Sequence, residues 1–153
     1  MRTDSRLSRM LHVLLHMARH DQPFTSEQIS KMLDTNPALV RRTMAGLKKA
    51  GYVHSENGRG GGWKISCELK TTTLDDIYKA VGEPRLLSIG VGSDNTQCAV
   101  EKSVINSLGQ TFQDAERVIR SRLACITLAD LLEDFDLLCQ EGEWGKDGPP
   151  SSD

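Results

Sequence analysis

Residues 25–49, TSEQISKMLDTNPALVRRTMAGLKK, predict two short helices joined by a tight turn. Thr25 and Gln28 have the spacing of a capping box, in which two side chains satisfy first-turn backbone amides. Asn36 can cap the second helix, and Pro37 fits its first position, where no amide hydrogen is needed. Two helices joined in this way form a helix-turn-helix. Helical spacing gives the second helix an inner face made of Val40, Thr43, Met44 and Leu47.

The outer face of that second helix is small and basic. Small side chains let a helix approach the floor of the major groove, and guanidinium groups hold phosphates or pair with guanine edges. A solvated face on an all-helical bundle would show the same pattern, so the face alone leaves both interpretations open. The outward positions are Ala38, Arg41, Arg42 and Ala45, followed by Lys48 and Lys49.

A glycine-rich loop follows the second helix. Two β-prone runs, 52–55 and 63–66, flank ENGRGGG at 56–62, which predicts a hairpin, the wing of a winged helix. Its glycines would let the backbone and Arg59 lie close to a sugar-phosphate chain or enter a minor groove. A nucleotide-binding loop is the alternative, but the GxxxxGK[ST] order is missing and the loop leads from strand to strand. The residues that we expect to contact DNA are Thr25, Ser26, Asn36, Ala38, Arg41, Arg42, Lys48, Arg59 and Gly60.

Charge is divided unevenly along the chain, although the net charge is only −2. Residues 1–66 carry 11 Lys and Arg against 5 Asp and Glu, a balance of +6, whereas residues 67–153 carry 8 against 16, a balance of −8. A basic first half and an acidic second half suggest a nucleic-acid-binding module followed by a part that avoids DNA. Chance segregation of solvated charges is the alternative.

Helical periodicity flanks this centre on both sides. It predicts helices over 5–20, over 74–81 after a Thr73 cap, over 99–123, and over 128–138 after a Thr127 cap. The longest of them has apolar residues near coiled-coil spacing and no obvious partner in so small a chain, which suggests dimerisation. The predicted dimerisation residues are Val100, Val104, Leu108, Phe112, Ala115 and Ile119.

The predicted fold class is mainly α with a small β-hairpin. We expect a winged helix-turn-helix DNA-binding domain over 1–82, a loop over 83–98, the dimerisation helix with a closing short helix over 99–139, and a disordered tail over 140–153. A chain of 153 residues fits one compact domain with an appended element. Its apolar content of 38% is lean, which suits apolar surface buried between chains.

The sequence predicts a cytoplasmic protein that does not enter a membrane. The longest run without Asp, Glu, Lys or Arg, residues 103–113, has 11 residues, and a membrane helix needs about 20. The N-terminus mixes charges and lacks a small-residue cleavage site, unlike a secretory signal. The four cysteines lie far apart without a CxxC pair, so they predict neither a zinc ribbon nor a disulfide framework.

Cys98 is the candidate sensor residue. It stands at the predicted start of the long helix, where unpaired amides and the helix dipole favour a thiolate. Oxidation there could shift the packing between dimer helices and DNA-binding domains, whereas a quiet or buried cysteine is the alternative. His12, His16 and His20 share a stripe that could chelate a divalent metal, but a solvated stripe has the same spacing, and we assign no metal site.

Four stretches resemble the bacterial Rrf2 family of winged-helix transcription regulators, which includes IscR, NsrR and CymR. They are residues 36–53, the wing GRGGGW at 58–63, TLDDIYKAV at 73–81 and ITLADL at 126–131, so the likeness covers about residues 5–135. Within the family the chain is most similar to the YwnA-like branch, which also has Cys, then Ala or Pro, then Val before the long helix. The resemblance implies a homodimer whose long helices pair and whose two winged domains read a near-palindromic operator.

The chain departs from that family at two places. The wing of the family commonly begins with Arg where this chain has Asn57, so Arg59 is the candidate substitute for a minor-groove arginine. Members that hold a two-iron two-sulfur cluster usually offer three cysteines ahead of the long helix. Here Cys98 stands alone and matches the third of them, so we expect no cofactor.

These observations predict a dimeric, sequence-specific DNA-binding transcriptional regulator, a repressor whose affinity responds to the redox state of Cys98. No Ser/His/Asp order, metal-protease motif or carboxylate pair suggests an enzyme. Two other functions stay open. One is a winged-helix module for protein contacts without specific DNA binding, and the other is a metal or iron–sulfur sensor that uses Cys98 with the histidines of the first helix.

Overall fold

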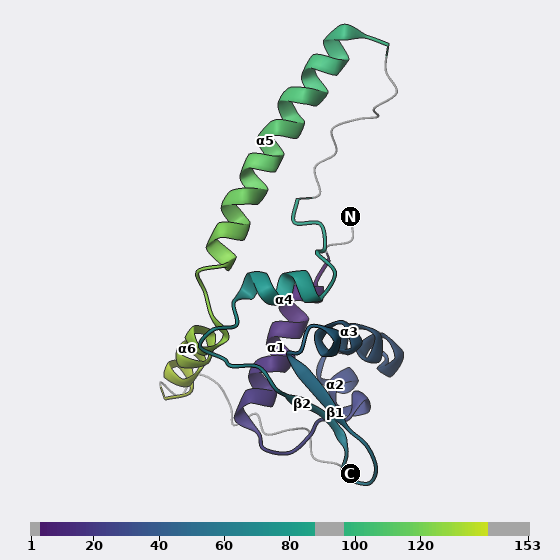
Figure 1. The fold of residues 1–153 in the computed structure, drawn as a ribbon, viewed down its shortest axis with the longest axis vertical. Coiled ribbons are helices and arrows are strands. Elements are labelled where there is room, and N and C mark those ends of the chain that lie inside the picture. Colours follow the sequence, from purple (N-terminus) through teal and green to yellow (C-terminus); the bar gives the residue numbers. More distant parts are fainter. Residues whose placement is uncertain (1–3, 88–96, 141–153) are drawn as a thin grey trace.

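The computed structural model describes residues 4–87 and 97–140. Figure 1 shows α5 projecting as a long rod from the other elements, which we call the body. The predicted fold class, mainly α with a small hairpin, is confirmed, whereas most of the predicted 83–98 loop and 140–153 tail lies outside the described residues. In chain order the elements are α1 (Arg6–Arg19), α2 (Ser26–Met32), α3 (Pro37–Lys49), β1 (Val53–Glu56), β2 (Gly62–Ile65), α4 (Leu74–Ala80), α5 (Ala99–Leu123) and α6 (Leu128–Gln140).

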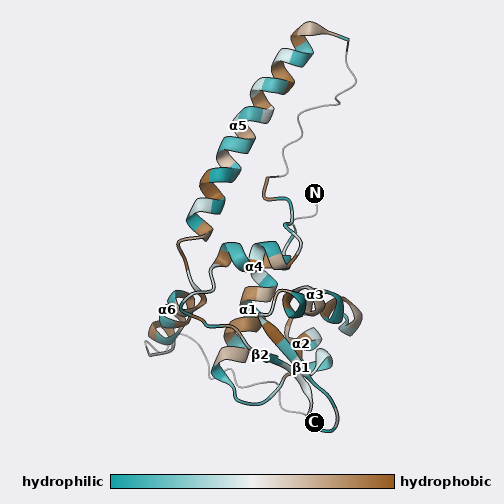
Figure 2. Ribbon diagram, viewed as in Figure 1, coloured by the Kyte–Doolittle hydropathy of each residue, from teal (hydrophilic) through white to brown (hydrophobic). Residues whose placement is uncertain are grey.

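Helix α1 lies at the centre of the body and contacts α4, α6 and β2. Its apolar stripe packs against the inner faces of α3 and α4, and Figure 2 colours much of this interior brown. Burying large apolar side chains is the main favourable contribution to folding, so this cluster, to which α2, α6 and β1 also contribute, holds the body together. The fully buried side chains are Val13, Leu14, Ile29, Val40, Met44, Leu47, Val53, Ile77 and Leu128.

The helix starts lie where the caps predict them. Thr25 Oγ1 accepts a hydrogen bond from the Gln28 backbone amide at 3.1 Å, and the Gln28 side chain accepts one from the Thr25 amide at 2.9 Å. The Asn36 side chain accepts from the Leu39 amide at 2.9 Å, and Pro37 is the first residue of α3. These local hydrogen bonds fix the turn between α2 and α3 and thereby the direction of α3.

The hairpin differs by one residue from its prediction. Its register pairs Val53 with Ile65 and Glu56 with Gly62, so Glu56 and Gly62 belong to the strands and not to the loop. Tyr52, predicted to start the first strand, lies before β1. The glycines allow a turn confined to residues 57–61, and the ladder therefore continues further toward the tip than residue propensity indicates.

The wing is joined to the segment before α2. Phe24 and Trp63 exchange two backbone hydrogen bonds, of 2.9 and 2.7 Å, as an isolated antiparallel bridge. Gly62 lies so close to this bridge that an added Cβ would approach the Phe24 carbonyl oxygen to 2.5 Å, and its φ of +152° suits glycine. The bridge fixes the wing beside the N-terminus of α2.

The C-terminal helix closes the body. Thr73 and Thr127 form an isolated bridge, and the Leu74 amide donates to the Ile126 carbonyl at 2.9 Å. Leu128 at the start of α6 is buried in the core. The C-terminal end of α5, at Leu123, is thus its base, which the short segment before α6 joins to the body.

Gly46 is expected to be a site where alanine destabilises the fold. A Cβ at this position of α3 would lie 2.6 Å from the carbonyl oxygen of Ala80, at the end of α4. Because that atom is backbone, the two helices must move apart, and overpacking of this kind typically costs about 1–3 kcal/mol. We expect Gly46→Ala to lower the urea midpoint of unfolding with an unchanged slope.

Gly109 provides the matched control. It lies within α5, and nothing lies within 4 Å of the Cβ that alanine would add there. In an open helical position alanine is favoured over glycine by up to about 1 kcal/mol. The same substitution should therefore stabilise the protein at position 109. Equal effects of the two substitutions would contradict the close approach of α3 and α4.

Candidate nucleic-acid interface

The outer face of α3 is exposed, as its helical spacing indicates. Val40, Met44 and Leu47 of the same helix are buried in the core, so α3 cannot rotate without exposing them. This fixes which side of the helix meets solvent. The exposed positions from 36 to 49 are Asn36, Ala38, Leu39, Arg41, Arg42, Ala45, Lys48 and Lys49.

Arg41 is held only weakly in its present position. One guanidinium nitrogen lies 3.7 Å from Oε1 of Glu27 on α2, and both side chains are more than half exposed. An exposed pair of this kind contributes little free energy, about 0–1 kcal/mol. Arg41 can therefore exchange the Glu27 carboxylate for a phosphate oxygen at small cost.

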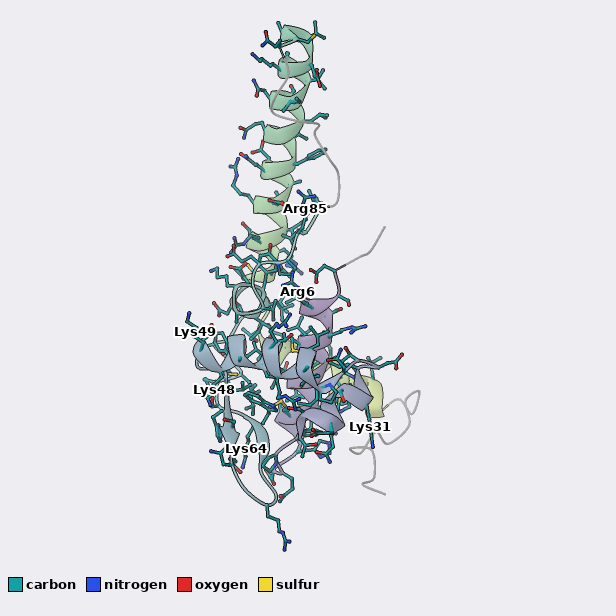
Figure 3. The ribbon with its side chains drawn as sticks, turned by 90° about the vertical axis from the view of Figure 1, so that its right-hand side faces the viewer. Arg6, Lys31, Lys48, Lys49, Lys64 and Arg85 are labelled. Atoms are coloured by element: carbon teal, nitrogen blue, oxygen red, sulfur yellow. The ribbon has the colours of Figure 1, made fainter. Side chains whose placement is uncertain are left out.

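Lys48 connects the end of α3 to the wing. Its Nζ donates a hydrogen bond of 2.8 Å to Oγ of Ser55 on β1. Figure 3 shows Lys48 and Lys49 at one edge of the body with Lys64 of β2 below them, whereas Lys31 lies on the opposite side. We call Lys48, Lys49 and Lys64 the basic edge. It extends the positive surface of α3 toward the hairpin.

Arg59 and Gly60 lie in the exposed turn between β1 and β2. The turn projects just beyond the bridge between Phe24 and Trp63, because Trp63 is only the second residue of β2. In a complex with DNA, a side chain there would be placed to reach the groove or backbone next to the groove that α3 would enter. Asn57, at the position where a family arginine is common, is exposed on the same turn.

The two hydroxyls at the start of α2 already have partners inside the chain. Thr25 caps α2, and Ser26 Oγ accepts a hydrogen bond of 3.0 Å from the indole nitrogen of Trp63. Ser26 is buried. The sequence predicts DNA contacts for both residues, whereas their packing favours a role in positioning α2 and the wing.

A second polar cluster, which sequence reasoning missed, lies where α5 meets the body. Arg120 of α5 donates through Nε to Oδ1 of Asp75 on α4 at 3.0 Å, and Lys79 lies 3.0 Å from the other Asp75 oxygen. Burial alone would raise the pKa of Asp75, but the hydrogen bonds from Arg120 and Lys79 outweigh it, so this pKa lies below its usual value. Asp75 and Arg120 are 45 residues apart, and no local pattern links them.

Cys98 and the histidines lie at different places. Cys98 is the exposed N-cap of α5, at the end of the rod farthest from the body. On α1 the Nε2 atoms of His12 and His16 are 2.9 Å apart, whereas His20 packs edge-on against Phe24 with ring centroids 5.7 Å apart. The predicted stripe is therefore divided. Within one chain, α1 does not come near the Cys98 end of α5.

Residues 3–134 match the family described as Rrf2, iron-dependent transcriptional regulator. The chain belongs to the Rrf2 family. It is 31% identical over 129 residues to YwnA of Bacillus subtilis, named as an HTH-type transcriptional regulator, and the alignment covers 84% of this chain and 96% of YwnA. These relatives are transcriptional regulators and not enzymes, which agrees with the sequence prediction.

Solved structures of similar proteins have the same fold. A crystal structure described as a transcriptional regulator from Lactobacillus plantarum matches with a TM-score of 0.71 and 25% identity, over 91% of this chain and 97% of that chain. The structure of IscR from T. potens matches with a TM-score of 0.61 and 21% identity, over 96% and 94%. The winged-helix architecture of this Rrf2 chain is therefore shared with known regulators.

The described residues of one copy of this chain provide no ligand set for the iron in the family description. Among residues 4–87 and 97–140, no three or more His, Cys, Asp and Glu side chains are grouped so that they could hold a metal ion. Cys67 lies near the body end of the hairpin and Cys125 between α5 and α6, on segments separate from Cys98. The same described residues include no helix long and apolar enough to cross a membrane.

Proposed function

We propose that this Rrf2-family protein is a sequence-specific DNA-binding repressor that acts as a homodimer on a near-palindromic operator. The observation that carries the proposal is the exposed basic face of α3, continued by the basic edge onto the wing. A helix of this composition fits the major groove, and a wing beside it fits the adjacent backbone or minor groove. The cytoplasm, where the bacterial chromosome lies, stays the expected location.

The exposed apolar residues of α5 support the proposed dimer. This helix has 25 residues, none of them buried, although its apolar residues recur along one side. Figure 2 shows brown segments along the rod, away from the body. A second copy would cover them by antiparallel or parallel pairing of the two rods. The exposed fractions are 73% for Val100, 50% for Val104, 39% for Leu108 and 71% for Val118, whereas Phe112, Ala115 and Ile119 are half-buried.

The predicted DNA-binding residues fall into two groups, those that would contact DNA and those that would support the helix-turn-helix. Arg41, Arg42, Lys48 and Arg59 reach solvent and would contact phosphates or base edges. Ala38 and Gly60 would allow close approach because they are small. The remaining three, Thr25, Ser26 and Asn36, would hold the helix-turn-helix in shape through their hydrogen bonds.

Cys98 is the proposed site of redox control. Its exposure at the N-cap of α5 makes the thiol accessible to oxidants and small thiols. A bulky or charged adduct there would act at the end of the apolar side of α5, beside Val100. We propose no resident cofactor, because Cys98 lacks two companion cysteines on its own segment.

Selection of bound sequences from a pool of random duplexes tests this function. The full chain, reduced, is expected to enrich one motif with inverted half-sites, and the oxidised chain is expected to enrich it more weakly. Cys98→Ser is the matched control, in which oxidant should change nothing. A protein-interaction module would enrich no sequence, and that outcome would contradict the proposed function. A motif enriched equally in both redox states would contradict redox control through Cys98 and leave the DNA-binding function in place.

A further inference from the structure

Arg120 makes the principal polar connection between α5 and the body. Among the other described elements α5 chiefly contacts α4, and Arg120 lies at this crossing. Its guanidinium donates to Asp75 at 3.0 Å, lies 3.5 Å from Oε1 of Glu83, and stacks 5.2 Å from the ring centre of Tyr78. One side chain of the rod therefore contacts three residues on or just after α4.

Two of the partners of Arg120, Asp75 and Tyr78, are buried in the body. Asp75 is 8% and Tyr78 is 6% exposed, and the Tyr78 hydroxyl donates to the Pro84 carbonyl at 2.9 Å. A guanidinium is planar and its donors form a fixed fork, so contacts to a carboxylate and a ring face together restrict its orientation. The contacts of Arg120 thus restrain both the distance between α5 and α4 and the direction in which α5 leaves the body.

Arg117, one turn before Arg120 on α5, forms no ion pair with α4 among the described residues. It pairs with Asp114 one turn away on the same helix, and both side chains are exposed. This ion pair joins α5 only to itself. Arg117 therefore serves as a matched control, because it has the same chemistry, lies on the same helix and forms its ion pair within α5.

The angle at this junction has a consequence for a dimer. If two rods pair, each body is attached to the common stem through the base of its α5, next to Leu123 and Ile126. Two recognition helices fit successive major grooves only when their centres are about 34 Å apart. A rotation at the junction moves α3 relative to the twofold axis and changes that separation.

We infer that Arg120 is a specificity-determining residue, which fixes the angle between α5 and the body through Asp75, Tyr78 and Glu83 and thereby sets the spacing of operator half-sites that the dimer accepts. The inference rests on the proposed function. Arg120 would decide which spacing between half-sites is accepted, whereas the exposed face of α3 would make the contacts within each half-site. Arg120 itself is a positioning residue and contacts no DNA in this scheme.

The experiment uses the duplex that the wild-type protein selects, together with versions in which one or two base pairs are inserted or deleted at its centre. Wild type is expected to bind the altered spacings at least about tenfold more weakly. Arg120→Gln should reduce this discrimination to about threefold or less, with an unchanged dimer mass. Arg117→Gln should discriminate like wild type, and Arg120→Lys, which keeps the charge but not the fork, should be intermediate.

Two results would overturn the inference. One is an Arg120→Gln protein that discriminates between spacings as wild type does. The other is an equal loss of affinity for all spacings, because a merely structural role would weaken every complex alike. If Arg120→Gln does not fold, Arg120→Lys is compared with wild type instead. Unchanged discrimination between spacings, or an equal loss of affinity for all spacings, would then overturn the inference. A wild-type protein that selects no sequence would instead overturn the proposed function, and this inference with it.

Discussion

Replacement of both Arg41 and Arg42 by alanine is expected to lower operator affinity about a hundredfold or more at physiological salt. Each arginine that touches a base or phosphate contributes about 1–3 kcal/mol, and both side chains point away from the core. The salt dependence should also become less steep, by about one unit for each phosphate that the variant no longer neutralises. Fluorescence anisotropy of a labelled duplex at several salt concentrations measures both quantities.

The control for this variant removes equal charge elsewhere. Lys102 and Arg117 are exposed on α5, away from α3 and the wing. Their double alanine variant should keep operator affinity within a few-fold of wild type, because distant exposed charges are screened. Undiminished binding by the Arg41 and Arg42 double variant would show that another surface of the protein meets DNA. Unfolding curves should coincide for both proteins, since none of the four side chains is buried.

Replacement of Val104 and Leu108 by aspartate is expected to convert the proposed dimer into a monomer at micromolar concentration. The two side chains are exposed in one chain, at successive turns of the apolar side of α5. Buried in a dimer, two unpaired carboxylates would cost several kcal/mol each, so the association constant should fall at least about a thousandfold. Light scattering after size-exclusion chromatography gives the mass.

Ser103→Asp combined with Asn106→Asp supplies the comparison. These residues are exposed on the other side of α5, so the same added charge should leave the mass unchanged. The monomeric variant should also bind the full operator far more weakly, because it no longer gains from two linked half-sites. A dimer that survives aspartate at 104 and 108 would place the self-association surface elsewhere.

The helix starts and the α3 face were predictable because their determinants are local. Thr25, Asn36 and Thr73 mark helix starts through side-chain hydrogen bonds to amides three residues away. Helical periodicity then separates the inner and outer faces of α3 without knowledge of the partners. The long helix over Ala99–Leu123 was predictable for the same reason.

The remaining features depend on contacts between distant segments. Ser26 stands in a run of small polar residues that favours exposure, yet the indole of Trp63 covers it from 37 positions away. The approach of Gly46 to Ala80 and the pairing of Asp75 with Arg120 have no periodic signal either. Such contacts depend on how the elements pack against one another, and local sequence patterns do not specify which distant residues meet.

The bridge between Phe24 and Trp63 has a consequence for the DNA. Because it ties the hairpin to the entry of α2, and Lys48 ties the hairpin to the end of α3, we expect α3 and the hairpin, the two proposed reading elements, to move together. Neither can adjust alone to an unfavourable groove width. The duplex must supply the adaptation, so the bendability of base steps that no side chain touches would help to decide which promoters are occupied.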